Sequence, residues 1–209
     1  MIVCDSKRFV FVHVQKTGGV TISRLIKEQL PDDEVRRVGK RHLSLRRILA
    51  AEPELTDYWI FGFVRDPWDR MASWWSMIER SQKRLENRGL TPAELGEWRK
   101  NNSFWRHAMT YKDFDEFVLR GTEEMGRLRC PQIRYLRTGK RRADFIGRTE
   151  NLTADIEKVM DRLGLSTEEL GHYNKGGSST NYRDFYTPAT RDRIATLFAK
   201  DIKAFGYEF

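Results

Sequence analysis

The segment Gln15-Lys16-Thr17-Gly18-Gly19-Val20-Thr21 has the residue types of an anion-binding loop. Glycines let a backbone approach a ligand closely, and the N–H groups that begin a helix attract negative charge. Lys16 adds a cation that can follow a phosphate or sulfate oxygen. A nucleotide-triphosphatase loop carries its lysine after the last glycine, whereas Lys16 precedes both Gly18 and Gly19. The sequence therefore predicts an oxyanion site that differs from that of an ordinary ATPase.

A second candidate anion site follows the apolar segment 58–64. Arg65 comes directly after this segment, and Ser73 lies one or two turns into the helix expected next. A guanidinium can bind a phosphate through two parallel hydrogen bonds, and a hydroxyl can add a third. In the alternative interpretation, Arg65 only pairs with Asp66 or Asp69.

Two strand-loop-helix units are expected to position these motifs. The apolar segments 8–14 and 58–64 are typical of buried strands, and each precedes a helical pattern, over 20–30 and from Asp66-Pro67 to about 80. Two such units predict a parallel sheet with helices packed on it. Further expected elements are strands over 35–38 and 144–147 and helices over 44–51, 91–100, 113–120, 153–163 and 187–203.

Length and composition limit the remaining possibilities. A chain of 209 residues suits a single domain, here 1–209, with a mostly helical insertion at about 81–142 that shows no clear strand. The net charge of +8 favours anionic partners of any kind. Two cysteines are too few for a disulfide framework or a zinc site. The absence of a leader pattern and of a membrane-length apolar stretch predicts a soluble, cytoplasmic protein.

The two motifs, in this order and each at a strand end, resemble the two signatures that bind 3′-phosphoadenosine 5′-phosphosulfate (PAPS) in carbohydrate sulfotransferases. The likeness is nearest to the heparan sulfate 2-O- and 6-O-type branch, sulfotransferase family 2, and 145–152 also resembles a later segment of that family. The resemblance implies a P-loop-NTPase-like three-layer α/β fold with a central parallel sheet flanked by helices. It further implies transfer of a sulfuryl group from PAPS to a hydroxyl, which leaves adenosine 3′,5′-bisphosphate (PAP) and requires no metal.

The resemblance also implies roles for individual residues. Lys16 would stabilise the bridging oxygen as it leaves, and Arg65 and Ser73 would bind the 3′-phosphate. The family usually has proline and serine where this chain has Gln15 and Ile22. The residues implied to hold the 5′-phosphosulfate are Lys16, Thr17, Gly18, Gly19, Val20 and Thr21. Those implied to lie in a loop over the nucleotide, within 172–182, are Lys175, Ser178 and Ser179.

Sulfuryl transfer requires a base to remove the acceptor proton, and histidine has a suitable pKa. His42 falls just before an expected helix between the two anion motifs, where similar sulfotransferases place their catalytic histidine. His13 lies in the first expected strand and is interpreted as a hydrogen-bonded core residue. His107 has less support, and a carboxylate base stays open, as does the interpretation of His42 as a surface or cap residue.

Two other functions remain as alternatives. A nucleotide-dependent kinase would use the same loop physics, but it would want a Gly-Lys-Ser/Thr order and a magnesium carboxylate, for which Asp66 is the one neat candidate. A basic nucleic-acid-binding module would need a recognition-helix or aromatic-sheet signature, which the sequence lacks, so no nucleic-acid partner is expected. The expected acceptor is a hydroxyl compound, and both an anionic glycan and a secondary metabolite are compatible with the sequence.

Overall fold

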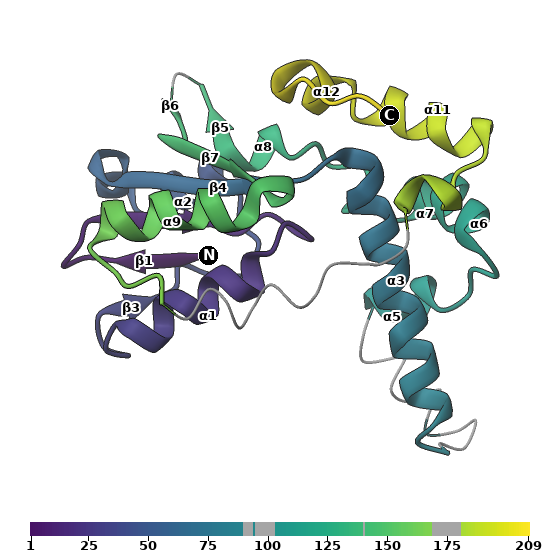
Figure 1. Ribbon diagram of the computed structural model, residues 1–209, viewed down its shortest axis with the longest axis horizontal. Helices are drawn as coiled ribbons and strands as arrows, with labels where there is room; N and C mark the ends of the chain where they lie inside the picture. Colours follow the sequence, from purple (N-terminus) through teal and green to yellow (C-terminus); the bar gives the residue numbers. More distant parts are fainter. Residues whose placement is uncertain (90–93, 95–102, 140, 169–180) are drawn as a thin grey trace. The chain divides into compact units, whose positions relative to one another are not determined.

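The computed structural model describes residues 1–89, 94, 103–139, 141–168 and 181–209. Its contacts divide the chain into two compact units (Figure 1). The first comprises the described residues within Met1–Asp66 and Gln132–Ser179, and the second those within Pro67–Pro131 and Thr180–Phe209. The expectation of one domain with an insertion over 81–142 stays a prediction.

The first unit is built on a five-stranded sheet in the order β3-β1-β2-β4-β7. Its strands are β1 (Ile2–Cys4), β2 (Phe9–Val12), β3 (Val35–Arg36), β4 (Trp59–Val64) and β7 (Phe145–Arg148). Strand β2 pairs in parallel with β4, and β4 with β7, whereas β1 pairs antiparallel with both β2 and β3. The sheet is therefore mostly parallel, which confirms in part the predicted central parallel sheet. The exception is β1, because a turn as short as the one between β1 and β2 can join only antiparallel strands.

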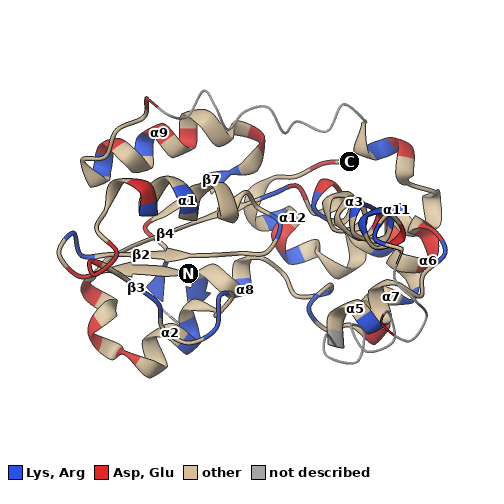
Figure 2. Cartoon of the chain, turned by 90° about the horizontal axis from the view of Figure 1, so that it is seen from below, with Lys and Arg blue, Asp and Glu red and all other residues tan. Residues whose placement is uncertain are grey.

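Helices flank both faces of this sheet (Figure 2). Helices α1 (Gly19–Gln29) and α9 (Leu152–Leu163) cover one face, and α2 (Leu45–Ala51) and α8 (Ile133–Leu136) lie on the other. Because alternate strand residues point to opposite faces, the phenylalanines of β2 and β4 all turn toward α1 and α9. These buried rings are Phe9, Phe11, Phe61 and Phe63.

The helix boundaries follow from local chemistry. Helix α1 ends before Pro31, as its periodicity predicts, and α9 ends at Gly164, which adopts the left-handed conformation typical of a helix end (φ 63°). Short elements complete the unit: the 3-10 helices η1 (Pro53–Asp57) and η2 (Thr149–Asn151) and the paired strands β5 (Arg137–Thr138) and β6 (Arg141–Arg142). The last pair lies within 81–142, and two-residue strands are too short to leave a sequence pattern.

The second unit is helical among its described residues. It contains α3 (Pro67–Glu86), α5 (Ser103–Ala108), α6 (Phe114–Leu119), α7 (Gly121–Glu124), η4 (Tyr182–Phe185), α11 (Pro188–Leu197) and α12 (Ala199–Phe205). Its core is aromatic: the rings of Trp75 and Phe117 lie 5.6 Å apart, and those of Phe114 and Tyr186 lie 4.8 Å apart. The single helix expected over 187–203 is divided at the buried Phe198. The helix expected over 91–100 lies outside the described residues, apart from Glu94.

Candidate active site

The loop that follows β2 carries two left-handed residues on either side of Thr17. Lys16 has φ 67° and Gly18 has φ 76°. This conformation costs a non-glycine residue about 1–2 kcal/mol, so the surrounding structure must hold Lys16 in place. Part of that support comes from Thr17, whose buried hydroxyl donates to the Val14 carbonyl at 3.0 Å. Successive N–H groups in such a turn form a concave anion-binding surface.

Helix α1 begins directly after this loop without a capping side chain. Gly18 is its N-cap residue and makes no side-chain cap hydrogen bond, and the first turn contains no acidic residue. The partial positive charge of the helix start is therefore not offset by a side chain of the helix itself. Together with Lys16, it makes this end of the helix suitable for an oxyanion.

Gly19 is required because the ring of His13 occupies the space beside it. A Cβ atom at Gly19 would lie 2.2 Å from both Cδ2 and Nε2 of His13, which is far inside van der Waals contact. His13 is only 4% exposed and stacks against Phe11, with ring centroids 5.7 Å apart. The buried imidazole thus packs against the first residue of α1 and leaves no space there for a side chain.

His13 also positions His42, the predicted base. Nδ1 of His42 lies 3.0 Å from the His13 carbonyl oxygen, and the two rings meet edge to face with centroids 4.6 Å apart. If Nδ1 carries the proton, it donates to this carbonyl and leaves Nε2 as the basic nitrogen. Burial, followed by the repulsion that a protonated His42, the N-terminal amine, Arg41 and Arg37 would exert on a second positive charge, lowers the pKa of His13 to about 3. His13 is therefore neutral near pH 7, in agreement with its predicted core role.

The second predicted anion site begins at the end of β4. Because β2 and β4 are parallel neighbours, Lys16 and Arg65 follow strands that end at the same edge of the sheet. The side-chain amide of Gln132 holds the Arg65 backbone at both ends: its Oε1 accepts from the Arg65 N–H at 3.0 Å, and its Nε2 donates to the Arg65 carbonyl at 2.7 Å.

The residues on either side of Arg65 are held in the same way. The Thr149 hydroxyl donates to the Val64 carbonyl at 3.0 Å, and Glu150 accepts from the Asp66 N–H at 2.5 Å. We call Gln132, Thr149 and Glu150 the β4 clamp. Three side chains distant in sequence thus fix the backbone that carries Arg65.

Comparison with known proteins decides the family. A model described as the Sulfotransferase family matches residues 1–208, which is essentially the whole chain. The chain belongs to the sulfotransferase family. A search of curated proteins found no match. Membership supports a sulfuryl-transfer function, and it confirms the family resemblance drawn from the two loop motifs without confirming the heparan sulfate branch.

The other predicted residues of this sulfotransferase-family chain are distributed as follows. Val20 is 67% exposed and Thr21 is half-buried, both in the first turn of α1. Ser73 is half-buried on α3 and belongs to the second unit, so its joint action with Arg65 stays a prediction. Predicted residues outside the described part of the chain are Lys175, Ser178 and Ser179.

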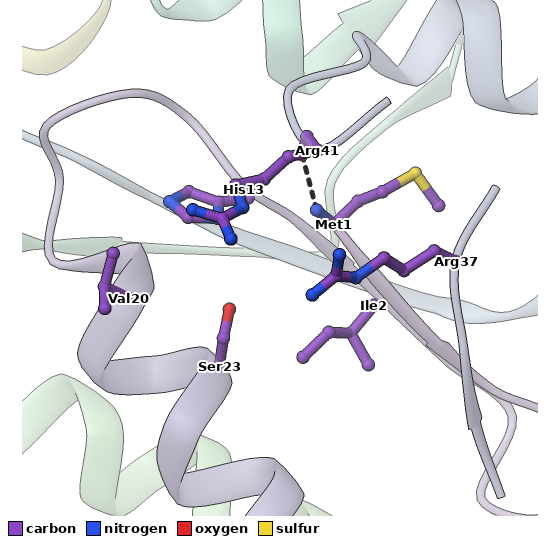
Figure 3. Close-up of a pocket in the computed structure, with 7 residues that line it drawn as sticks. All are labelled: Met1, Ile2, His13, Val20, Ser23, Arg37 and Arg41. Carbon is purple, nitrogen blue, oxygen red and sulfur yellow. Dashed lines mark hydrogen bonds between the residues drawn. The ribbon is translucent and has the colours of Figure 1, made fainter. Parts of the chain in front are cut away.

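Sequence reasoning missed the β4 clamp and a cationic cavity. Thr149 and Glu150 lie in the segment that resembles the family, which was a usable signal, whereas nothing near Gln132 marks it. The cavity, lined by Met1, Ile2, His13, Val20, Ser23, Arg37 and Arg41, lies beside the first turn of α1 (Figure 3). Its arginines belong to basic clusters that, in sequence, suggest only a solvated surface.

Two observations concern the expected cellular location and the expected metal independence. Among the described helices, none is both long and apolar enough to cross a membrane. In the same residues, no three or more His, Cys, Asp and Glu side chains gather in a way that could hold a metal ion. The expected cytoplasmic location and metal independence stay predictions.

Proposed function

We propose that this protein is a PAPS-dependent O-sulfotransferase with a P-loop-like donor site. One observation carries the proposal: the Lys16 loop, the uncapped start of α1 and His42 belong to one compact unit and are joined through His13. Sulfuryl transfer requires a cation, an anion-binding backbone and a general base, and here an imidazole is proposed as the base. Family membership supports the same reaction class.

The 5′-phosphosulfate of the donor would bind at the loop Lys16–Thr21. The N–H groups at the start of α1 would hold its oxygens, and Lys16 would neutralise the charge that develops on the bridging oxygen. PAPS supplies an activated sulfuryl group, so the chain has to supply orientation, charge stabilisation and a base. Thr17 serves this site indirectly, since its hydroxyl donates to Val14.

The 3′-phosphate of the donor would bind at Arg65 and Ser73. The β4 clamp supports this role because a bidentate guanidinium contact needs a fixed backbone. Lys175, Ser178 and Ser179 are proposed to lie in a segment that covers the nucleotide.

His42 is proposed as the general base that takes the proton of the acceptor hydroxyl. The contact between Nδ1 and the His13 carbonyl sets the orientation of the ring, as a second hydrogen-bonding partner does for other catalytic imidazoles. Removal of the imidazole should lower turnover while the affinity for PAP is kept.

Calorimetry with PAP, and separately with ATP and magnesium, tests the proposal against the kinase alternative. We expect heat with PAP, and we expect Lys16→Met to lower turnover by about a hundredfold to a thousandfold, as loss of one transition-state cation or donor does. His42→Ala should lose turnover with unchanged PAP affinity. Stronger binding of ATP with magnesium than of PAP would refute the assignment, and normal rates in His42→Ala would remove the base alone.

A further inference from the structure

The cavity beside α1 shares Val20 with the proposed donor loop, and it is also lined by His13, which lies beside Gly19. It has a volume of about 60 Å³, and its lining includes neither Lys16, Thr17 nor Gly18. His13 contributes its ring to the cavity and its carbonyl oxygen to the orientation of His42. A molecule that placed a hydroxyl near His42 could therefore place a neighbouring substituent in this cavity.

The charge in the cavity comes from two arginines. Figure 3 shows the guanidinium groups of Arg37 and Arg41 directed toward the same space, with the Ser23 hydroxyl opposite them. The Ser23 hydroxyl donates to the Gly19 carbonyl at 2.6 Å, so recognition of charge falls to the arginines. The cavity lining contains no Asp or Glu.

The neighbouring Arg36 differs from Arg37 and Arg41 in its carboxylate partners. Arg36 forms salt bridges with Asp5 at 2.5 Å and with Glu52 at 2.6 Å. Within the described residues, neither Arg37 nor Arg41 has a carboxylate partner within salt-bridge distance. Their positive field reaches the buried His13, where it contributes to the lowered pKa.

The loop that carries the arginines is fixed rather than loosely attached. The Met1 nitrogen donates to the Arg41 carbonyl oxygen at 2.5 Å, which ties the loop to the start of β1. Val38, between the arginines, is buried. The backbone that carries the two arginines is thus ordered at Val38 and Arg41, while both arginine side chains are exposed; the ordered backbone reduces part of the entropy lost on binding.

We propose that this cavity is a subsite for an anionic substituent of the acceptor, a carboxylate or a sulfate ester, bound by Arg37 and Arg41. The inference rests on the proposed function and adds the chemical class of the acceptor. A cavity of 60 Å³ accommodates about four water molecules, a size that suits one charged group rather than a sugar ring. The ring would lie outside, between this subsite and His42.

Binding of three small glycosides to the PAP-loaded protein tests the subsite. The probes are methyl β-glucuronide, methyl β-glucoside 6-sulfate and the neutral methyl β-glucoside, followed by NMR of the arginine side-chain N–H signals. We expect each anionic probe to bind about tenfold or more tightly than the neutral one, because charge-assisted hydrogen bonds are the stronger class. Tighter binding of one anionic probe than of the other would support the proposal and identify the substituent.

Three variants make the test specific. Arg37→Gln and Arg41→Gln should each remove most of the preference for the anionic probes. Lys40→Gln removes the same charge from the same loop, but Lys40 does not line the cavity, so the preference should remain. Thermal unfolding of each variant checks that it folds.

The outcomes separate this inference from the proposed function. Normal PAP binding with equal affinity for charged and neutral probes would overturn the subsite alone. An equal loss of preference in Lys40→Gln and Arg41→Gln would also overturn it, because it would show a diffuse field instead of a site. Failure of the wild-type protein to bind PAP would overturn the proposed function and, with it, the acceptor assignment.

Discussion

The two strand ends that face the proposed donor are held by opposite means. The loop after β2 is fixed from within, by the Thr17 hydroxyl on Val14 and by the His13 ring against Gly19. The segment after β4 is fixed from outside, by the β4 clamp. Both ends therefore present a basic residue on a supported backbone, with different residues responsible for the support.

This difference determines what a substitution does at each end. A change within the β2 loop acts on a neighbour a few residues away and should disturb packing and the anion site together. Loss of a clamp residue removes one partner from the backbone of the β4 segment, although every residue of the segment itself is intact. Defects at the second end should therefore appear mainly as weaker binding of the nucleotide.

The most severe expected change is Gly19→Ala in the β2 loop. The new methyl group would meet the buried His13 ring at 2.2 Å, and overpacking of this kind costs about 3 kcal/mol. We expect a corresponding drop in the free energy of unfolding, measured with urea, and weak PAP binding. Gly126→Ala is the matched control, because a Cβ atom there has no neighbour within 4 Å.

A double-mutant cycle shows whether the His13 ring is the cause. Addition of His13→Ala to Gly19→Ala should recover part of the lost stability, since the small side chain leaves space for the methyl group. If the stability losses of the two single variants simply added in the double variant, the His13 ring would not be the cause. The loop would then not be held by its own residues.

Gln132→Leu tests the outside support of the β4 end. The change leaves the Arg65 N–H and carbonyl without this partner, at a cost of about 2 kcal/mol. Because Arg65 is proposed to bind the 3′-phosphate, we expect the Kd for PAP to rise about tenfold, with kcat at saturating PAPS unchanged. Isothermal titration and steady-state kinetics separate the two effects.

Gln29 offers a close control for this variant. Its side-chain amide holds Ser166 in the same two-point manner, with Nε2 donating to the Ser166 carbonyl at 3.0 Å and Oε1 accepting from its N–H at 2.6 Å. Gln29→Leu should lower stability and leave PAP affinity intact. If both glutamine variants weakened PAP binding equally, the clamp would have no special role.

The same contrast explains which parts of the molecule the sequence reveals. The strands β2 and β4 and the helices α1 and α9 are predicted well, because their hydrophobic periodicity and their Gly, Pro and strand-end signals are local. Strand β1 is not predicted, since three residues are too few to leave a strand pattern in the sequence. The helix expected over 187–203 is divided at Phe198, where tertiary packing overrides a continuous pattern.

The residues of the candidate site differ in the same way in whether the sequence reveals them. The Lys16 loop and His42 are visible in the sequence because residue type and position relative to a strand or helix carry the chemistry. Gln132 cannot be identified from the sequence, because it lies 67 residues from its partner Arg65 and its role exists only through that contact. Arg37 and Arg41 look like ordinary surface charge until a cavity between them is seen.

The smallest expected effect is the pH dependence that His13 adds to the β2 end. Its pKa of about 3 lies below the ordinary 6.5, so between these values the unfolded chain binds a proton that the folded chain does not. The free energy of unfolding therefore falls as the pH falls through this window, by about 1.4 kcal/mol at about pH 5.5. Above about pH 7 the histidine is neutral in both states and adds no dependence.

Urea unfolding of the wild type and of His13→Gln, each at about pH 7.5 and about pH 5.5, gives the stability that each protein loses on acidification. The difference between these two losses measures the contribution of His13. The variant should lose less stability on acidification, since other titrating groups are shared by both proteins. NMR of the wild-type His13 ring should show no titration down to about pH 5, because the same burial that supports Gly19 excludes the proton. If the His13 ring titrates near its ordinary pKa, water reaches the ring beneath the loop. The β2 end would then depend on support from outside the loop, as the β4 end does.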